Sequence, residues 1–327
     1  MNEVKILTGE CRKSLQTLEP QSINTCVTSP PYWGLRDYGT GTWEGGDPDC
    51  PHMRLTKISK DTSTGHRGMY DQGSVVGDAI YKSSCPQCGA TRKDEQLGLE
   101  DTPEEYAENL VSVFREVRRV LRDDGTVWLN LGDSYSGSGK GPPGNLNKDY
   151  HHLEHAHSKI VPDGLKPKDL VGIPWRVAFA LQADGWYLRQ DIIWHKPNPM
   201  PESVKDRCTK AHEYIFLLSK NKTYHFDPKG IEERVNHDTR NKRTVWTVNV
   251  DSYREAHFAT YPPELIRPCI MAGCPEGGTV LDPFAGSGTT GMVSAHNDRN
   301  AVLCEINPEY VEIIRKRMDS DMFIALV

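Results

Sequence analysis

The segment TVLDPFAGSGTTGMVSA, residues 279–295, decides the fold class of this chain. An apolar strand ends at Asp282, a glycine-rich turn follows, and a helix begins near Thr289 and Thr290. Glycines let a backbone approach a ligand closely, and the N-terminus of a helix offers unpaired N–H groups. This layout is typical of a nucleotide-type site at the carboxyl end of a parallel strand. A tight turn that binds no ligand is the alternative.

A second acidic strand end follows in AVLCEI, residues 301–306, where Glu305 could accept hydrogen bonds from both hydroxyls of a ribose. The glycine-rich turn does not match G-x-x-x-x-G-K-[ST], so the pattern disfavours a nucleoside triphosphate. An acid at each of two strand ends favours a bound ligand over an empty turn.

Apolar runs alternate with helical patterns, which indicates an α/β sheet of mostly parallel strands. The clearest helix follows Thr102, an N-cap residue, with Pro103 at its first position and Glu105 in a capping box. Gly125 is predicted to end this helix. Seven strands are predicted, at residues 4–9, 24–29, 125–133, 187–196, 213–220, 278–284 and 301–306.

The segment TSPPYWG, residues 28–34, directly follows the second of these strands. Two prolines cannot donate to a strand ladder, so the strand must stop, yet two large aromatic residues follow the break. A strand end with its aromatic side chains in the core is the alternative to a functional site. Trp33 could line a pocket or pack in the core, and both interpretations stay open.

Together the two motifs resemble those of the DNA amino-methyltransferases. LDPFAGSGTTG is similar to the S-adenosylmethionine-binding motif of that family, and TSPPYW is similar to its catalytic (D/N/S)-P-P-(Y/F) motif. HFATYPPELI (257–266) stands just ahead of the glycine-rich turn, and the catalytic motif comes first, which resembles the beta class. The resemblance implies a single methyltransferase domain over 1–327 with a circularly permuted, Rossmann-like sheet of seven strands.

The resemblance also assigns residues to roles. The catalytic motif would comprise Ser29, Pro30, Pro31 and Tyr32. S-adenosylmethionine would be bound by Thr28, Phe258, Asp282, Pro283, Phe284, Ala285, Gly286, Ser287, Gly288, Thr289, Thr290 and Glu305.

The catalytic motif suits the chemistry of an exocyclic amino group. The lone pair of that nitrogen is delocalised into the base, and acceptors aimed at its two hydrogens free the lone pair for attack on a sulfonium methyl. The Ser29 hydroxyl and the Pro30 carbonyl are suitable acceptors, and Tyr32 could stack on a base taken out of the duplex. In the family, Ser at the first position leans towards N(4) of cytosine, and N(6) of adenine is the alternative.

The cysteines indicate a metal site. The chain has nine cysteines, an odd number scattered along its length, which favours thiols or metal ligands over a disulfide framework. SCPQCGA (84–90) is a C-P-x-C-G knuckle, and DPDCPH supplies a second pair. A structural zinc site is predicted; a reduced turn with buried thiols is the alternative, and His66 could replace the first histidine. The predicted ligands are Cys50, His52, Cys85 and Cys88.

Contact with double-stranded DNA has to come from local patches, because the net charge is −6. Between residues 205 and 243, ten basic residues stand against six acidic ones, and TRNKR (239–243) is the densest piece. Phosphate contact is predicted for a region at 203–256, and a solvated face is the alternative. Residues 40–100 form the predicted zinc insertion, and residues 134–168, with the cluster HHLEHAH (151–157), form a second insertion expected to be flexible.

Three classes of function fit parts of these patterns. A site-specific DNA methyltransferase explains both motifs. A nicotinamide oxidoreductase would need G-x-G-x-x-G and gives no reason for TSPPYW, while a non-catalytic zinc-containing nucleic-acid-binding module would be expected to carry a damaged motif. A cognate restriction endonuclease is a possible partner. No membrane span or signal peptide is recognised, so the expected location is cytoplasmic, with nucleoid association through DNA.

Overall fold

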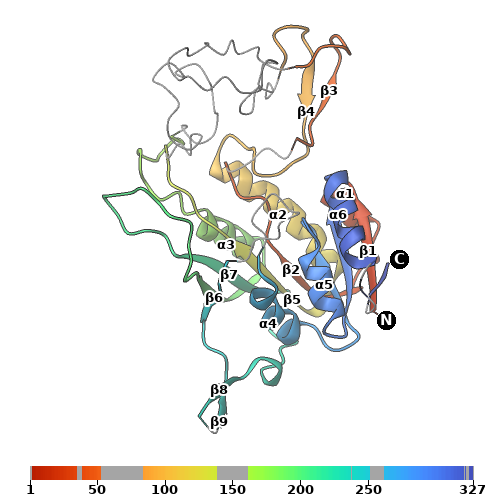
Figure 1. The fold of residues 1–327 in the computed structure, drawn as a ribbon, viewed down its shortest axis with the longest axis vertical. Coiled ribbons are helices and arrows are strands. Elements are labelled where there is room, and N and C mark those ends of the chain that lie inside the picture. Colours follow the sequence, from red (N-terminus) through yellow and green to blue (C-terminus); the bar gives the residue numbers. More distant parts are fainter. Residues whose placement is uncertain are drawn as a thin grey trace, which may run out of the picture.

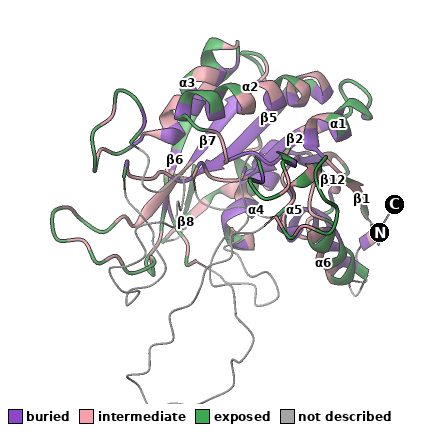
Figure 2. Ribbon diagram, turned by 90° about the horizontal axis from the view of Figure 1, so that it is seen from above, coloured by how far each residue is buried: buried purple, intermediate pink, exposed green. Residues whose placement is uncertain are grey.

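The protein is an α/β structure in which helices cover both faces of one central sheet (Figures 1 and 2). This computed structural model describes residues 2–34, 39–52, 84–137, 161–236, 238–250, 261–319, 321 and 324–326. Its helices are α1 (Cys11–Gln16), α2 (Pro103–Val120), α3 (Ile173–Ala183), α4 (Pro263–Gly273), α5 (Thr289–Ala295), α6 (Pro308–Asp319) and the 3-10 helix Lys229–Ile231. None of the helices in the described part of the chain is both long and apolar enough to cross a membrane.

The central sheet has nine strands in the order β10-β6-β7-β5-β2-β11-β12-β1-β13. Only β7 pairs antiparallel with its neighbours, so the prediction of a mostly parallel sheet is confirmed. The strands are β1 (Asn2–Thr8), β2 (Ile23–Thr28), β5 (Leu121–Leu131), β6 (Tyr187–His195), β7 (His212–Ser219), β10 (Val245–Thr247), β11 (Thr279–Asp282), β12 (Asn300–Glu305) and β13 (Ile324–Leu326). Two small hairpins lie outside it, β3 (Thr42–Glu44) with β4 (Thr91–Lys93), and β8 (Glu233–Val235) with β9 (Asp238–Arg240).

The expected count of seven strands was wrong. All seven predicted strands exist, and β10 and β13 add one more at each edge of the sheet. Each of these edge strands has only three residues, VWT and IAL, which is too short to show an alternating apolar pattern.

The centre of the sheet joins the two ends of the chain. β2 pairs with β11, β11 with β12, and β12 with β1, all in parallel. Parallel pairing places the carboxyl ends of these strands, and therefore Thr28, Asp282 and Glu305, along one edge of the sheet. The circular permutation relative to other methyltransferases stays a prediction.

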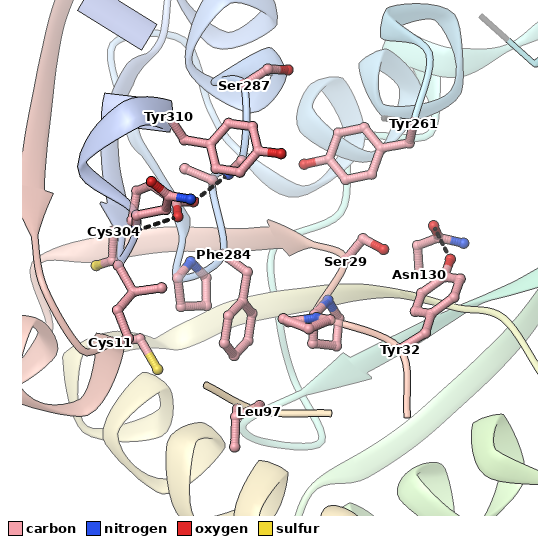
Figure 3. A pocket seen from close by; sticks show the side chains of 18 of the residues that line it. Cys11, Ser29, Tyr32, Leu97, Asn130, Tyr261, Phe284, Ser287, Cys304 and Tyr310 are labelled. Carbon is pink, nitrogen blue, oxygen red and sulfur yellow. Dashed lines mark hydrogen bonds between the residues drawn. The ribbon is translucent and has the colours of Figure 1, made fainter. Parts of the chain in front are cut away.

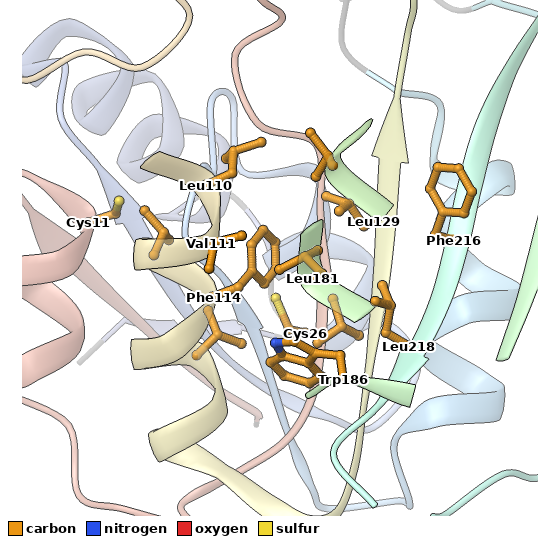
Figure 4. Packing of buried hydrophobic residues seen from close by; sticks show 14 of the residues in the cluster. Cys11, Cys26, Leu110, Val111, Phe114, Leu129, Leu181, Trp186, Phe216 and Leu218 are labelled. Carbon is orange, nitrogen blue, oxygen red and sulfur yellow. The ribbon is translucent and has the colours of Figure 1, made fainter. Parts of the chain in front are cut away.

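Helix α2 shows how the sequence forms one of these layers. The amide of Glu105 donates to the Thr102 hydroxyl at 3.1 Å, so the predicted N-cap is confirmed. One face of α2 packs with α3 on the sheet, and Phe114, Leu181 and Trp186 meet in this core (Figure 4). The predicted end at Gly125 was wrong, because α2 stops at Val120 and the chain enters β5 directly.

The two predicted insertions are described only at their ends. In Figure 1 the hairpin of β3 and β4 stands beyond one end of the sheet, and the hairpin of β8 and β9 lies beyond the other. Residues 53–83 and 138–160 lie outside the described residues, and with them the predictions for His66 and for HHLEHAH.

Candidate active site

A single elongated cavity runs along the carboxyl ends of the central strands (Figure 3). Residues 283–287, Thr289 and Glu305 line one part of it, and Ser29, Pro30, Pro31 and Tyr32 line another. Figure 3 shows the ring of Phe284 between these two groups. The structure therefore brings the two sequence motifs, about 250 residues apart, to one cavity.

Asp282 lies behind the wall of this cavity. It is fully buried, and its carboxylate accepts hydrogen bonds from Thr28 Oγ1 (2.6 Å), Thr290 Oγ1 (2.5 Å), the Tyr261 hydroxyl (2.8 Å) and the Phe284 amide (3.0 Å). Burial raises the pKa of Asp282, and these hydrogen bonds oppose the rise. Neither Asp282 nor its partners Thr28 and Thr290 line the cavity, and Gly288 does not line it either. Together they hold the glycine-rich turn in place from behind.

Glu305 is the second acidic residue of the site, and it does line the cavity. Its two carboxylate oxygens accept hydrogen bonds from the amides of Gly286 (2.8 Å) and Asn307 (2.9 Å). Burial raises the pKa of Glu305 to about 7, although both amides act in the opposite direction. The carboxylate therefore ties β12 to the glycine-rich turn, and it titrates near neutral pH.

The loop after β2 is clamped by residues from two other segments. The Pro31 carbonyl accepts a hydrogen bond from the Tyr106 hydroxyl at 2.9 Å. The Gly34 amide donates to the Gly98 carbonyl, and Trp33 Nε1 donates to the Glu100 carbonyl, both at 2.9 Å. Trp33 is only 6% exposed and belongs to the main core, so its interpretation as a core residue is confirmed.

Tyr32 is held by a polar network at the other end of the cavity. Its hydroxyl donates to Glu213 Oε2 at 2.7 Å and to Asn130 Oδ1 at 3.2 Å. Lys196 forms an ion pair with Glu213, and its ammonium lies 4.1 Å from the centre of the Trp194 ring. Burial, reinforced by the Glu213 charge, raises the pKa of Tyr32 well above its ordinary value. The phenol therefore stays protonated and its ring has a fixed orientation.

The four predicted metal ligands come together in the insertion. One ligand atom from each of Cys50, His52, Cys85 and Cys88 lies within 4.8 Å of all the others. The Cys50 and Cys85 sulfurs are 3.7 Å apart, and Cys88 Sγ lies 3.4 Å from His52 Nδ1. The turn is shaped locally, because the Gly89 amide donates to the Cys85 carbonyl at 2.7 Å and Gly89 has a φ of +78°.

The basic region at 203–256 divides between two ends of the sheet. β10 runs parallel to β6 towards the cavity, which Val250 lines, so the hairpin before β10 lies at the amino end of the strands. Arg240 and Arg243 of this hairpin segment both pair with Glu233. Residues 203–211, in the loop between β6 and β7, lie at the carboxyl end together with Glu213 and Val250.

Several cavity residues were missed in the sequence. They are Gly9, Glu10, Cys11, Glu95, Gln96, Leu97, Asn130, Trp194, Lys196, Glu213, Val250, Tyr261, Cys304, Ile306, Asn307 and Tyr310. A signal existed for the first three, because TGEC follows the predicted strand 4–9 and the carboxyl ends of parallel strands meet at one edge. Phe258, which was predicted, lies outside the described residues.

Comparisons with known proteins support one family. The family model of a DNA methylase matches residues 23–316. The Type II methyltransferase M.SmaI of Serratia marcescens is 43% identical over 323 residues, covering 97% of this chain and 91% of that protein.

Solved structures support the same fold. The cytosine-N4-specific PvuII DNA methyltransferase superposes with a TM-score of 0.61 at 18% identity, covering 99% of this chain and 89% of its own. The complex of M1.HpyAVI with S-adenosylmethionine superposes with a TM-score of 0.52 at 15% identity, covering 97% and 99%.

Proposed function

From the premise that this chain belongs to the DNA methylase family, and is an S-adenosylmethionine-dependent DNA methyltransferase, we infer that it methylates N(4) of a cytosine extruded from duplex DNA. One observation carries this inference. Ser29 and Pro30, the proposed amino-group acceptors, line the same cavity as the glycine-rich turn. A methyl donor on the turn and an amino group at Ser29 would therefore meet in one cavity.

The residues around the turn fit S-adenosylmethionine. The turn supplies backbone amides at the start of α5, Phe284 supplies an apolar face, and Glu305 supplies acceptors for the ribose hydroxyls. Asp282 would act indirectly, because it is fully buried and holds the turn rather than the ligand. When bound, S-adenosylmethionine supplies a sulfonium methyl group as the electrophile.

The loop after β2 would prepare the amino group of the base. The Ser29 hydroxyl and the Pro30 carbonyl would accept hydrogen bonds from the two N–H groups of the amino group. These bonds favour a pyramidal nitrogen and free its lone pair. The clamping of Pro31 by Tyr106 keeps these acceptors in place. Glu213 and Asn130 orient the ring of Tyr32, which would stack on the extruded base.

Two features favour cytosine over adenine. Ser29 occupies the first motif position, and the Lys196 ammonium lines the cavity beside the Tyr32 network. Cytosine carries a second acceptor, O2, beside N3, whereas adenine has a C–H group at the corresponding place. An ammonium donor therefore suits cytosine better. N(6)-adenine methylation is the second candidate.

Single-molecule sequencing of DNA from cells that express the protein tests this proposal. We expect N(4)-methylcytosine at one fixed sequence motif, and its absence from cells that express the Ser29→Ala variant. N(6)-methyladenine at a fixed motif would show that the target base is adenine and not cytosine. Unmodified DNA would overturn the proposed reaction.

We also propose that Cys50, His52, Cys85 and Cys88 bind a structural zinc ion. A tetrahedron with Zn–S bonds of about 2.3 Å has sulfur–sulfur edges of about 3.8 Å, and a sulfur–nitrogen edge is about 0.2 Å shorter. The Cys50–Cys85 sulfur separation of 3.7 Å and the Cys88 Sγ–His52 Nδ1 separation of 3.4 Å are close to these edges. Four protein ligands leave no open position, so the ion would stabilise the insertion and take no part in the chemistry.

Contact with the duplex is proposed for the carboxyl end of the sheet. The loop at 203–211 adjoins the cavity, whereas TRNKR lies at the opposite end, and two of its arginines pair with Glu233. We therefore restrict the DNA-contacting part of 203–256 to this loop and to Val250 with its neighbours. Because the relatives are Type II methyltransferases, a cognate restriction endonuclease is proposed as a partner in the same restriction-modification system.

A further inference from the structure

The loop between β6 and β7 carries an exposed apolar side chain next to the cavity. Its first part reads KPNPMPES, residues 196–203. Met200 is 76% exposed, which is more than any other large apolar side chain in the described part of the chain. Single exposed apolar residues are common on protein surfaces, so exposure alone indicates no function. The local structure around Met200 is the further observation that points to a function.

The segment around Met200 is rigid. Pro197, Pro199 and Pro201 alternate with the residues between them, and each fixes its own φ near −65°. The side-chain amide of Asn198 makes two hydrogen bonds to the backbone of Val250. Its Nδ2 donates to the Val250 carbonyl at 3.2 Å, and its Oδ1 accepts from the Val250 amide at 2.8 Å. The conformational entropy of this segment is therefore already largely lost before any partner binds.

The far side of the segment is fastened as well. Glu202 accepts hydrogen bonds from Arg207 at 2.8 Å and from the Lys210 amide at 3.1 Å. The Lys196 amide donates to the Ala211 carbonyl at 2.8 Å, which closes the base of the loop. Met200 is thus presented on a braced loop, although its own side chain stays largely exposed.

The position of the loop identifies its partner. Lys196 and Val250 line the cavity, and Met200 is four positions after Lys196, a reach of at most about 14 Å. DNA whose base enters this cavity must lie against the same rim. Extruding a base leaves a gap in the stack, and proteins that disturb a stack often insert an apolar side chain between bases.

We propose that Met200 enters the duplex and fills the gap left by the extruded base. An unbranched, polarisable side chain suits an irregular gap between base pairs. The proline-braced backbone would add little ordering cost of its own, so mainly the rotamer freedom of the Met200 side chain would be lost. The proposal rests on the proposed function, because it concerns DNA from which a base has been extruded.

Rates of methyl transfer on two matched duplexes test the proposal. Both carry the sequence motif found by sequencing; in one the target base is paired, and in the other it faces a mismatch that is already easy to open. We expect Met200→Ala to lower the single-turnover rate on the paired duplex by about tenfold or more, because base opening costs a few kcal/mol. On the mismatched duplex the loss should be under about threefold. Met200→Leu, which keeps an apolar side chain of similar length, should restore the rate on the paired duplex.

Val245→Ala is the matched control. Val245 is also exposed and apolar, at 58%, but it lies within the edge strand β10, in register with Ile193 of β6, and belongs neither to the loop nor to the cavity lining. We expect wild-type rates for it on both duplexes. If Met200→Ala lowers the methyl-transfer rate equally on both duplexes, or on neither, Met200 does not fill the gap and the proposal is overturned. If the wild-type protein methylates neither duplex, the proposed function itself fails.

Discussion

At the scale of single residues, two acidic side chains at neighbouring strand ends have different environments. Asp282 has four hydrogen-bond donors and no access to the cavity, whereas Glu305 has two amide donors and lines the cavity. An unpaired donor in a buried network costs about 1–3 kcal/mol. Asp282 therefore has a structural role, whereas the charge of Glu305 would interact directly with a ligand.

Glu305 predicts a pH-dependent affinity for S-adenosylmethionine. Its pKa is raised to about 7, so below neutral pH the carboxyl is protonated and loses acceptor capacity for the ribose hydroxyls. We expect the affinity, measured by calorimetry, to fall as the pH is lowered through about 7. The ligand 5′-methylthioadenosine should show the same fall, because it keeps the ribose and lacks the amino acid that titrates in S-adenosylmethionine. A flat profile for both ligands would exclude the ribose contact.

The same pKa shift has a consequence for stability. The folded protein holds a proton on Glu305 over a pH range in which the unfolded chain, with a carboxyl pKa near 4.5, has lost it. The contribution of Glu305 to the free energy of unfolding therefore decreases as pH rises from about 4.5 to about 7. This group alone makes the ligand-free protein less stable at neutral pH than at mildly acidic pH.

Glu213 is expected to act as a positioning residue for Tyr32. Glu213→Gln replaces a charged acceptor of the Tyr32 hydroxyl by a neutral one and leaves Lys196 without its ion pair. Hydrogen bonds to charged groups contribute about 1.5–3 kcal/mol, so the methyl-transfer rate should fall by about 10- to 100-fold. The affinity for S-adenosylmethionine should stay unchanged, since that end of the cavity is built from β11 and β12.

Tyr32→Phe supplies the comparison for this prediction. It removes the hydroxyl that Glu213 and Asn130 bind but keeps the ring. The double variant should lose little more rate than the worse of the two single variants, because both disturb one network. Additive losses would mean that Glu213 and Tyr32 act independently.

At the scale of elements, the insertion that carries the Cys50, His52, Cys85 and Cys88 cluster and the loop after β2 form one connected unit. The chain returns from the insertion through residues 94–100, and three of these, Glu95, Gln96 and Leu97, line the cavity. A side chain on Gly98 would place its Cβ 2.9 Å from the Tyr32 carbonyl, which only glycine avoids here. An ordered insertion would therefore also stabilise the conformation of the loop that carries Ser29 and Tyr32.

Loss of the metal should separate DNA methylation from cofactor binding. We expect purified protein to contain about one equivalent of zinc and Cys85→Ser to lose it. The variant should methylate DNA poorly, because residues 94–100 lose their anchor, yet bind S-adenosylmethionine as the wild type does. Elemental analysis and calorimetry provide the two measurements.

Cys269→Ala is the control for this experiment, because Cys269 lies in α4, outside the cluster, and alanine keeps a small apolar side chain at this buried position. It should keep both the metal and the activity. If wild-type protein purified without chelator contains no metal, the zinc proposal is wrong. If a zinc-free variant methylates DNA normally, the metal is not needed for activity.

Local signals in the sequence predicted some elements well and others poorly. The cap of α2 was predicted because Thr102 and Pro103 act within one turn, whereas its end was not, because burial of Leu121 in β5 overrides the helix pattern. Each of the two sequence motifs was predicted at a strand end from its local pattern, and the resemblance to DNA amino-methyltransferases joined them; their common cavity follows from the parallel pairing of β2 with β11. Lys196 and Glu213 could not be predicted, since only the antiparallel pairing of β6 with β7 brings them together.

At the scale of the whole molecule, positive charge is distributed over both ends of the sheet, and only one end adjoins the cavity. Exposed Lys205 lies in the loop between β6 and β7. Arg240 and Arg243 lie at the opposite end and share Glu233. The sequence shows one basic region, and only the fold divides it.

The salt dependence of DNA binding should distinguish these two ends. Lys205→Gln should lower the slope of log affinity against log salt concentration by about 1, the value for one lost phosphate contact. Arg240→Gln with Arg243→Gln should leave the slope unchanged, although this variant removes twice the charge. The reverse result would place the duplex at the amino end of the sheet and contradict the proposed binding face.

The interleaving of β1 and β2 with β11 and β12 has a consequence for how the protein is made. When the ribosome has translated the first 278 residues, β2 and its neighbour β5 exist, but β11, which pairs with the other edge of β2, and β12, which pairs with β1, have not been synthesised. These pairings span almost the entire chain, and contacts of such large sequence separation form slowly. A nascent chain therefore exposes one edge of β2 until β11 has been made, and both edges of β1 until β12 and β13 have been made. Methylation of DNA can begin only after that delay, so truncated translation products contribute none of it.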